Sequence, residues 1–298
     1  MQSSSGGIFI LLCEYIISNG GIVCGAVYDK NFVVKHSFAR TLDECITFQG
    51  SKYVQSDIRG IYPKIKSILK DNIPVLFSGT PCQVAGLKLY LRKDYNNLYT
   101  VDLICHGVPS PLIFKDYLNF VRGKNVISHI NMKSKSKIKG TTIRFDFFNG
   151  KSVQQTLKTD IWNKLYFRHY IVRPSCHNCK FTHYNRVGDI TIGDYWGIDK
   201  YYPKFHPEKM VSLIMINNNK GAFMLNGISM KIDSILVSKS ETIQNALKTS
   251  CKPNIERSQF WFDYTKHGFE YIANKYLEYT FYYRIKDKIR QVLSFFKN

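Results

Sequence analysis

The chain has 298 residues, of which 44% are hydrophobic and 14% aromatic, so it can bury one large core or two smaller ones. This composition excludes a disordered or low-complexity protein. Lysine and arginine outnumber aspartate and glutamate by 42 to 22, and the formal net charge of +20 favours acidic partners, polyanions or anionic membrane surfaces. The chain is also rich in Ile, Asn, Tyr and Phe, a usage that by itself brings many lysines, and its aromatic residues follow no nucleic-acid-binding pattern. We therefore expect no specific nucleic-acid partner.

The first apolar run, residues 8–17, is too short to span a bilayer and is interrupted by Glu14. No cationic segment precedes it, so it lacks the anatomy of a signal peptide. We therefore expect a cytoplasmic protein. In such a reducing compartment, clustered cysteines bind metal more often than they form disulfides.

Helices and strands alternate along the first 125 residues. We expect helices over residues 8–18, 59–70, 83–92 and 111–121, and strands over residues 22–28, 32–38, 74–78 and 98–104. The segment Thr41-Leu42-Asp43-Glu44 predicts a capping box at the start of a further short helix. Alternation of this kind predicts a mostly parallel sheet, whose binding crevice is formed by loops at the carboxyl ends of adjacent strands.

The pattern changes after residue 125. We expect a basic, serine-rich loop over residues 133–139 and a hairpin of residues 141–148 and 152–156 around Asn149-Gly150. The remaining expected elements are a helix over residues 160–170, strands over residues 189–192 and 211–217, and a helical, aromatic part from about Glu241. Residues 284–297 predict a basic amphipathic helix, which either packs on the domain or lies on a membrane surface.

These elements predict a mixed α/β (α+β) fold: a parallel-rich sheet flanked by helices, with an antiparallel insertion and a helical C-terminus. We expect residues 1–125 and 126–240 to form the two halves of one domain, and residues 241–298 to form a helical extension.

Four cysteines form the strongest candidate site. Cys176-x-x-Cys179 is a chelating pair, because this spacing lets two thiolates of one turn reach the same metal. Cys82 and Cys105 each follow a predicted strand, at neighbouring strand ends, and are the candidate partners of that pair. Four thiolates suit either Zn²⁺ or a [4Fe–4S] cluster. Two ligands are solitary and widely separated in sequence, which favours the cluster.

The other cysteines carry less information. Cys13 and Cys24 fall in apolar elements and are expected in the core, and Cys45 and Cys251 have no ligand-like neighbours in sequence. Of the eight histidines only His106, beside Cys105 in a Gly/Pro loop, is a candidate for proton transfer, and a structural role suits it equally. The SSSGG segment exposes backbone N–H groups at a helix N-terminus, where a phosphate can bind. The same residues can instead serve as an ordinary helix cap.

Six segments, read together, resemble the coenzyme F420 hydrogenase/dehydrogenase beta-subunit family. They are SSSGGIF, GSKYVQS, VLFSGTPCQVAGLK, VDLICHGVPSP, RPSCHNCKF and GDITIGDYWG. The resemblance runs in order from about residue 3 to about residue 225, and the last 70 or so residues carry no usable motif.

The resemblance implies a flavoprotein with FAD and a [4Fe–4S] cluster that moves electrons between iron–sulfur centres and an organic hydride acceptor. It implies these cluster ligands: Cys82, Cys105, Cys176 and Cys179. It implies a flavin neighbourhood in residues 1–125, formed by Ser4, Ser5, Gly6, Gly7, Gly50, Ser51, Lys52, Tyr53 and Gln55. The acceptor crevice would be lined by Thr80, Pro81 and Gln83. Lys52 would stabilise negative charge on the reduced flavin ring, unless it is a solvated surface lysine.

Many relatives with the CHGVPSP and GDYWG motifs carry an N-terminal ferredoxin-like segment, whereas this sequence starts almost at SSSGG. We therefore expect a separate ferredoxin-like electron donor, whose docking a positive net charge would favour. This subtype is often associated with bacterial surface-polysaccharide gene clusters, so the acceptor need not be F420. The alternative function is a non-catalytic, zinc-stabilised, basic binding or assembly protein of polysaccharide biosynthesis. The C-terminal helix would give peripheral contact with the inner membrane face.

Overall fold

The computed structural model describes residues 5–136, 140–156, 159–205 and 210–277. The chain forms two compact units, each built from two separate stretches. The first unit consists of Met1–Gly107 and Ser175–Cys251, and the second of Val108–Pro174 and Lys252–Asn298. The units are thus interleaved in sequence, unlike the consecutive segments 1–125, 126–240 and 241–298 that we expected. The reason is that the chain leaves the first unit after Gly107 and returns at Ser175 to complete its sheet.

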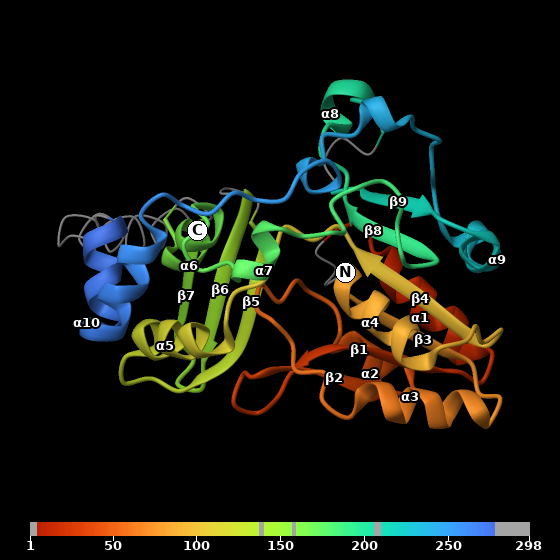
Figure 1. The fold of residues 1–298 in the computed structure, drawn as a ribbon, viewed down its shortest axis with the longest axis horizontal. Helices are drawn as coiled ribbons and strands as arrows, with labels where there is room; N and C mark the ends of the chain where they lie inside the picture. The colour runs from red at the N-terminus through yellow and green to blue at the C-terminus, as the bar shows by residue number, and fades with distance from the viewer. Residues whose placement is uncertain (1–4, 137–139, 157–158, 206–209, 278–298) are drawn as a thin grey trace. The chain divides into compact units, whose positions relative to one another are not determined.

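A six-stranded sheet organises the first unit, in the order β2-β1-β3-β4-β8-β9 (Figure 1). Its strands are β1 (Ile22–Tyr28), β2 (Val34–Ala39), β3 (Val75–Gly79), β4 (Leu98–Leu103), β8 (Ile190–Asp194) and β9 (Ser212–Ile216). The four central strands run parallel, and β2 and β9 pair antiparallel at the two edges. The predicted mixed α/β fold with a parallel-rich sheet is confirmed.

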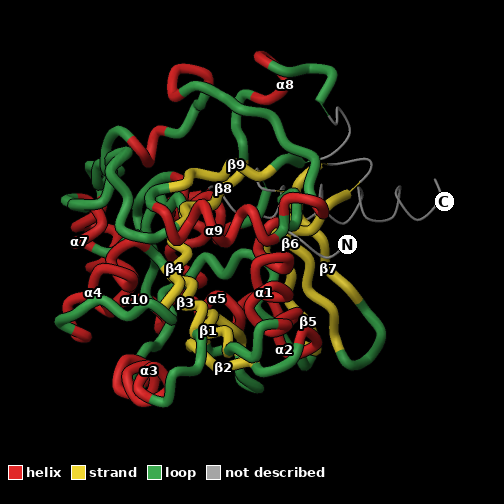
Figure 2. The backbone as a smooth tube through the Cα atoms, turned by 90° about the vertical axis from the view of Figure 1, so that its right-hand side faces the viewer, coloured by secondary structure: helices red, strands yellow, loops and turns green. Residues whose placement is uncertain are grey.

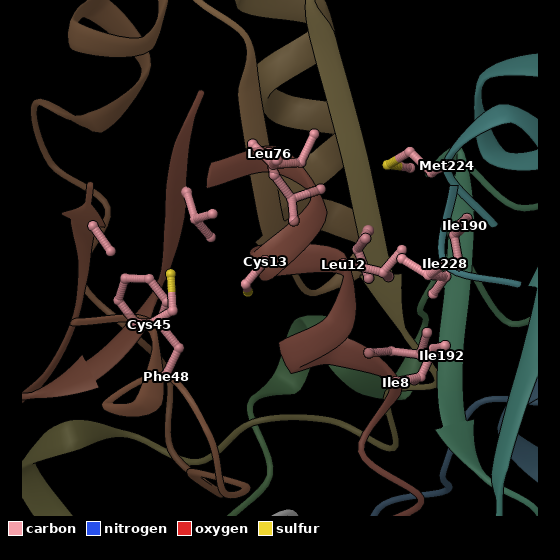
Figure 3. Packing of buried hydrophobic residues seen from close by; sticks show 14 residues of the cluster. Ile8, Leu12, Cys13, Cys45, Phe48, Leu76, Ile190, Ile192, Met224 and Ile228 are labelled. Atoms are coloured by element: carbon pink, nitrogen blue, oxygen red, sulfur yellow. The ribbon is translucent and has the colours of Figure 1, made fainter. Parts of the chain in front are cut away.

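Helices cover both faces of this sheet. Those of the first unit are α1 (Ile8–Ser18), α2 (Leu42–Ile46), α3 (Ile61–Lys70), α4 (Pro81–Leu91), α8 (Ile198–Tyr201) and α9 (Asn219–Gly227). Helix α7 (Pro174–His177) begins where the chain re-enters the first unit. Short 3-10 turns follow at Ser229–Lys231, Lys239–Glu241 and Asn245–Leu247. On one face, α1, α2 and α9 pack against Val23, Leu76 and Val101 (Figure 3). On the other face, α3 and α4 pack against residues such as Ile22 and Phe77. Apolar residues therefore point to both faces, as a doubly covered parallel sheet requires.

Local signals set several boundaries. Helix α1 and strand β1 have the predicted bounds, with Gly7 at φ 92° before α1 and Asn19 after it. The capping box of α2 is present, since Thr41 accepts from the N–H of Glu44 and the Glu44 side chain accepts in return. As expected, Cys13 and Cys24 are buried in the core.

The second unit contains an antiparallel sheet in the order β5-β6-β7 (Figure 2). Its elements are β5 (Ile127–Ser136), β6 (Gly140–Phe147), β7 (Ser152–Thr156), α5 (Pro111–Arg122), α6 (Ile161–Phe167) and α10 (Arg257–Leu277). The predicted hairpin is confirmed as β6 and β7. Aromatic rings fill the core, with Tyr117 stacked on Trp162 at 5.3 Å between ring centroids.

Two expectations for the second unit were wrong. Residues 133–136, predicted as part of a basic loop, belong to β5, because pairing with β6 overrides their polar character, and Lys133 is buried. Helix α10 begins at Arg257 rather than near Glu241, because the preceding stretch is mostly irregular. The predicted basic helix over residues 284–297 lies outside the described residues. Within the described ranges, no helix is both long and apolar enough to cross a membrane.

Candidate functional site

The loop after β3 carries the first proposed ligand. Thr80 precedes α4 and forms a capping box with Gln83, and Pro81 occupies the first helical turn, where its missing N–H costs nothing. Cys82 follows on the same turn and is exposed, with its Sγ 3.1 Å from Thr80 Oγ1. The local sequence TPCQ therefore builds a rigid helix start that presents a thiol.

The loop after β4 carries Cys105, which is half-buried. Burial raises the pKa of the Cys105 thiol to about 12, and the neighbouring charges of Cys176, Cys82 and Cys179 add to the rise. Residues from the other strand end and from the C-x-x-C segment thus lie near Cys105 within the first unit. That the four thiols bind one metal centre stays a prediction.

A fifth thiol, that of Cys251, lies beside this group. The sequence did not predict this proximity. Cys251 was expected to lack ligand-like neighbours, but its Sγ lies 3.6 Å from His177 Nδ1, next to the C-x-x-C pair. Burial raises the pKa of Cys251 to about 11, and the charges of Cys176 and Cys179 contribute. No local signal indicated this proximity, because about 70 residues separate the segments.

Lys52 lies in the loop after α2 and is only partly exposed, so it is not a solvated surface lysine. Its Nζ lies within hydrogen-bond distance, 2.9–3.2 Å, of four backbone carbonyls, which share its three N–H donors: those of Thr47, Phe48, Gln49 and Gly50. Burial lowers its pKa to about 7. Lys52 therefore holds together the loop that follows α2, and its predicted contact with a flavin ring stays a prediction.

Gln83 joins two of the predicted site segments. Its Nε2 donates to Ser56 Oγ at 2.9 Å, and its Oε1 accepts from the Thr80 N–H at 3.0 Å. Tyr62 donates to the Gln83 carbonyl at 2.7 Å. The GSKYVQS loop and the start of α4 are therefore held together by one amide side chain, and Ser56 is a member of the site that the sequence did not single out.

The same loop also approaches the GDYWG segment. Burial and the negative charge of Asp194 together raise the pKa of Tyr53 to about 12. Three other predicted flavin neighbours, Gly50, Ser51 and Gln55, lie in this loop, which has no regular secondary structure.

The SSSGG segment is bound to strand β9. Ser5 Oγ donates to the Val211 carbonyl at 3.0 Å, and the Gly6 N–H donates to Ser212 Oγ at 3.0 Å. The Gly6 amide is thus already engaged by the protein, whereas Gly7 precedes α1 in the left-handed conformation. Ser4 lies outside the described residues.

Two histidines stand near these loops. His106 is half-buried in the loop after β4, and its proton-transfer role stays a prediction. His36 on β2 is buried, stacks on Phe77, and donates from Nε2 to the Ser78 carbonyl at 2.9 Å. Burial lowers the pKa of His36, and the charge of Lys52 lowers it further. Side chains alternate between the two faces of a strand, so His36 faces the same side as the apolar Val34 two positions earlier. This spacing is the sequence signal for an inward-facing histidine.

Residues 74–241 of this chain match the family model that describes the C terminus of the coenzyme F420 hydrogenase/dehydrogenase beta subunit. The chain belongs to this family. The matched region contains both strand-end loops, the C-x-x-C pair and the GDYWG segment, so the resemblance seen in the motifs is confirmed. Membership assigns the chain to a family of redox subunits.

A similar fold occurs in a solved structure of the xenon-derivatised F420-reducing [NiFe] hydrogenase complex from Methanosarcina barkeri. The TM-score is 0.52 with 18% sequence identity, covering 77% of this chain and 74% of the other. At this identity the likeness concerns the fold alone. No curated protein matches the chain.

Proposed function

We propose that this chain is an iron–sulfur flavoprotein oxidoreductase that transfers electrons between a separate ferredoxin-like donor and an organic hydride acceptor. The proposed ligands of a [4Fe–4S] cluster are Cys82, Cys105, Cys176 and Cys179. FAD would bind at the SSSGG and GSKYVQS segments. When bound, the cluster exchanges single electrons, and the flavin exchanges electron pairs with the acceptor.

One observation supports this proposal: Cys82, Cys176 and Cys179, from two other segments of the same unit, lie near enough to Cys105 for their charges to raise its pKa. All eight cysteines carry thiols rather than disulfides. A set of four thiolates on a rigid α/β framework fits an iron–sulfur cluster, and the family match covers all four residues.

The flavin assignment rests on the loop that contains Lys52. This loop is fastened to the start of α4 through Gln83 and Ser56, so its backbone is ordered before any ligand arrives. Burial lowers the pKa of Lys52 to about 7, so an anionic group bound nearby would favour its protonated, positively charged form. Lys52 would orient and electrostatically stabilise the ring, and His106 would hold or move a proton at the strand-end loop.

The exposed thiol of Cys82 supports an electron partner that approaches this edge of the sheet, because electron transfer needs a short path to the protein surface. The net charge of +20 favours an acidic, ferredoxin-like donor. The acceptor crevice would be formed by Thr80, Pro81 and Gln83.

Metal and flavin analysis of anaerobically purified protein, with an ultraviolet–visible spectrum, tests the proposal. We expect about four irons, matching sulfide and one flavin per chain. Cys176→Ser should lose the iron, whereas the matched control Cys24→Ser, which changes a core thiol on β1, should retain it. A colourless protein with one zinc per chain would contradict the proposal and favour the zinc-stabilised binding protein.

A further inference from the structure

Arg186 is the most deeply buried ion-paired arginine among the described residues. Its side chain is 1% exposed and pairs with fully buried Asp102, with Nη2 2.9 Å from Oδ1. Burying both charges is costly, so such a pair is weak evidence for stability by itself. Its other contacts indicate what it does.

The guanidinium also donates to three backbone carbonyls. Nη1 donates to Phe181 at 2.7 Å and to His183 at 3.4 Å, and Nη2 donates to Leu103 at 3.1 Å. Phe181 lies two residues after Cys179, and Leu103 lies two residues before Cys105. One planar group therefore bridges the segments that carry the C-x-x-C pair and the thiol after β4.

The pair is anchored to the sheet on its other side. Asp102 Oδ2 accepts from the Gly188 N–H at 2.8 Å, and Arg186 Nε lies 3.3 Å from Thr191 Oγ1 on β8. A Cβ on Gly188 would lie 2.8 Å from the Asp102 nitrogen, so only glycine permits this approach. Contacts with β4 and β8 therefore fix the guanidinium, and its bond to the Phe181 carbonyl ties the segment after Cys179 to this sheet edge.

We infer that Arg186 is a positioning residue that holds the Cys105 and Cys179 segments at a set separation for the metal centre. This inference rests on the proposed function for the nature of that centre. A fork of five N–H donors can bind a carboxylate and three carbonyls at once, whereas the single ammonium of lysine cannot keep this geometry. Arg186→Lys keeps the charge and removes the bridge.

The test compares Arg186→Lys with the matched control Arg59→Lys in the full-length protein. Arg59 also pairs with an aspartate, Asp57, but its side chain is 91% exposed. Amide hydrogen exchange is measured first on metal-free protein. In Arg186→Lys, we expect faster exchange confined to residues 102–107 and 176–187. After iron and sulfide reconstitution, we expect iron loss to a chelator to accelerate about 10–100-fold and the electron paramagnetic resonance signal to change. Arg59→Lys should match the wild type throughout.

Wild-type exchange and iron retention in Arg186→Lys would overturn the inference. If that variant does not fold, Asp102→Asn replaces it, because the amide oxygen still accepts from Arg186 while the charge and the acceptor for the Gly188 N–H are lost. Uniformly faster exchange across the first unit in the variant that folds, or failure of both to fold, would reduce Arg186 to a general core residue and also overturn the inference. If the wild type takes up no iron, the proposed function fails, but the exchange comparison still decides whether Arg186 bridges the two segments.

Discussion

Replacing Lys52 by methionine should flatten the pH dependence of stability between pH 7 and 8.5. Burial lowers the pKa of this lysine to about 7, whereas an unfolded lysine titrates near 10.4. Between these values the unfolded chain holds a proton that the folded protein has released. Raising the pH across this window therefore favours the folded state, and wild-type stability should rise.

The size of the effect follows from the two pKa values. Integrating the difference in bound protons from pH 7 to 8.5 gives a gain of at most about 1.6 kcal/mol in the free energy of unfolding. The four carbonyls that accept from the Lys52 ammonium favour its charged form and oppose the shift, so the measured gain should not exceed this value.

Urea unfolding at four pH values between 7 and 8.5 measures this slope for the wild type, Lys52→Met and the control Lys30→Met. Lys30 is an exposed lysine in the turn between β1 and β2, so its replacement should leave the slope unchanged. Thiols that titrate above pH 8 affect all three proteins alike and cancel in the difference. If stability rises with pH as steeply in Lys52→Met as in the wild type, the reasoning is refuted. Lys52 of the folded wild type would then stay protonated throughout this pH range.

Three further predictions concern other residues. Cys251→Ser should retain full iron content in metal analysis, because four other thiols are the proposed ligands, and iron loss would make Cys251 a ligand. Gln83→Leu removes a helix cap and the bond to Ser56, and should lower the free energy of unfolding by about 1–2 kcal/mol and weaken flavin binding in a fluorescence titration. Unchanged flavin affinity would contradict the role of this contact. Burial raises the pKa of Asp160 to about 6, so between pH 4 and 6 the folded protein keeps a proton that the unfolded chain has lost. The free energy of unfolding of the wild type should therefore fall as the pH rises from 4 to 6. Asp160→Asn cannot titrate; its amide oxygen can still accept from the Asn163 N–H, and its NH2 can donate to the Tyr117 hydroxyl oxygen. It should therefore remove this fall and raise stability at pH 7 by up to about 3 kcal/mol in urea unfolding, whereas an unchanged fall would show that another group titrates.

Short-range patterns predicted the local elements well. The bounds of α1 and β1 and the capping box at Thr41 depend on residues within a few positions of one another, so the sequence contains their causes. The alternation of strands and helices likewise predicted a parallel sheet with Cys82 and Cys105 at neighbouring strand ends, because parallel strands joined by helices end on the same side.

Long-range pairing decided the rest. Strand β8 joins β4 although 86 residues lie between them, and the intervening chain forms much of the second unit. Residues 133–136 became a strand because a partner strand was present, against their own polar composition.

The sequence alone therefore determined the fold class, the family motifs and the candidate thiols. Only the tertiary structure decided that Lys52 binds the carbonyls of the loop after α2, that Cys251 lies beside His177 of the C-x-x-C segment, and that Arg186 bridges two ligand-bearing segments. These contacts join residues whose spacing carries no period or motif. They form because a buried polar group without a hydrogen bond is costly. Each such group therefore pairs with whatever partner the folded chain places nearby.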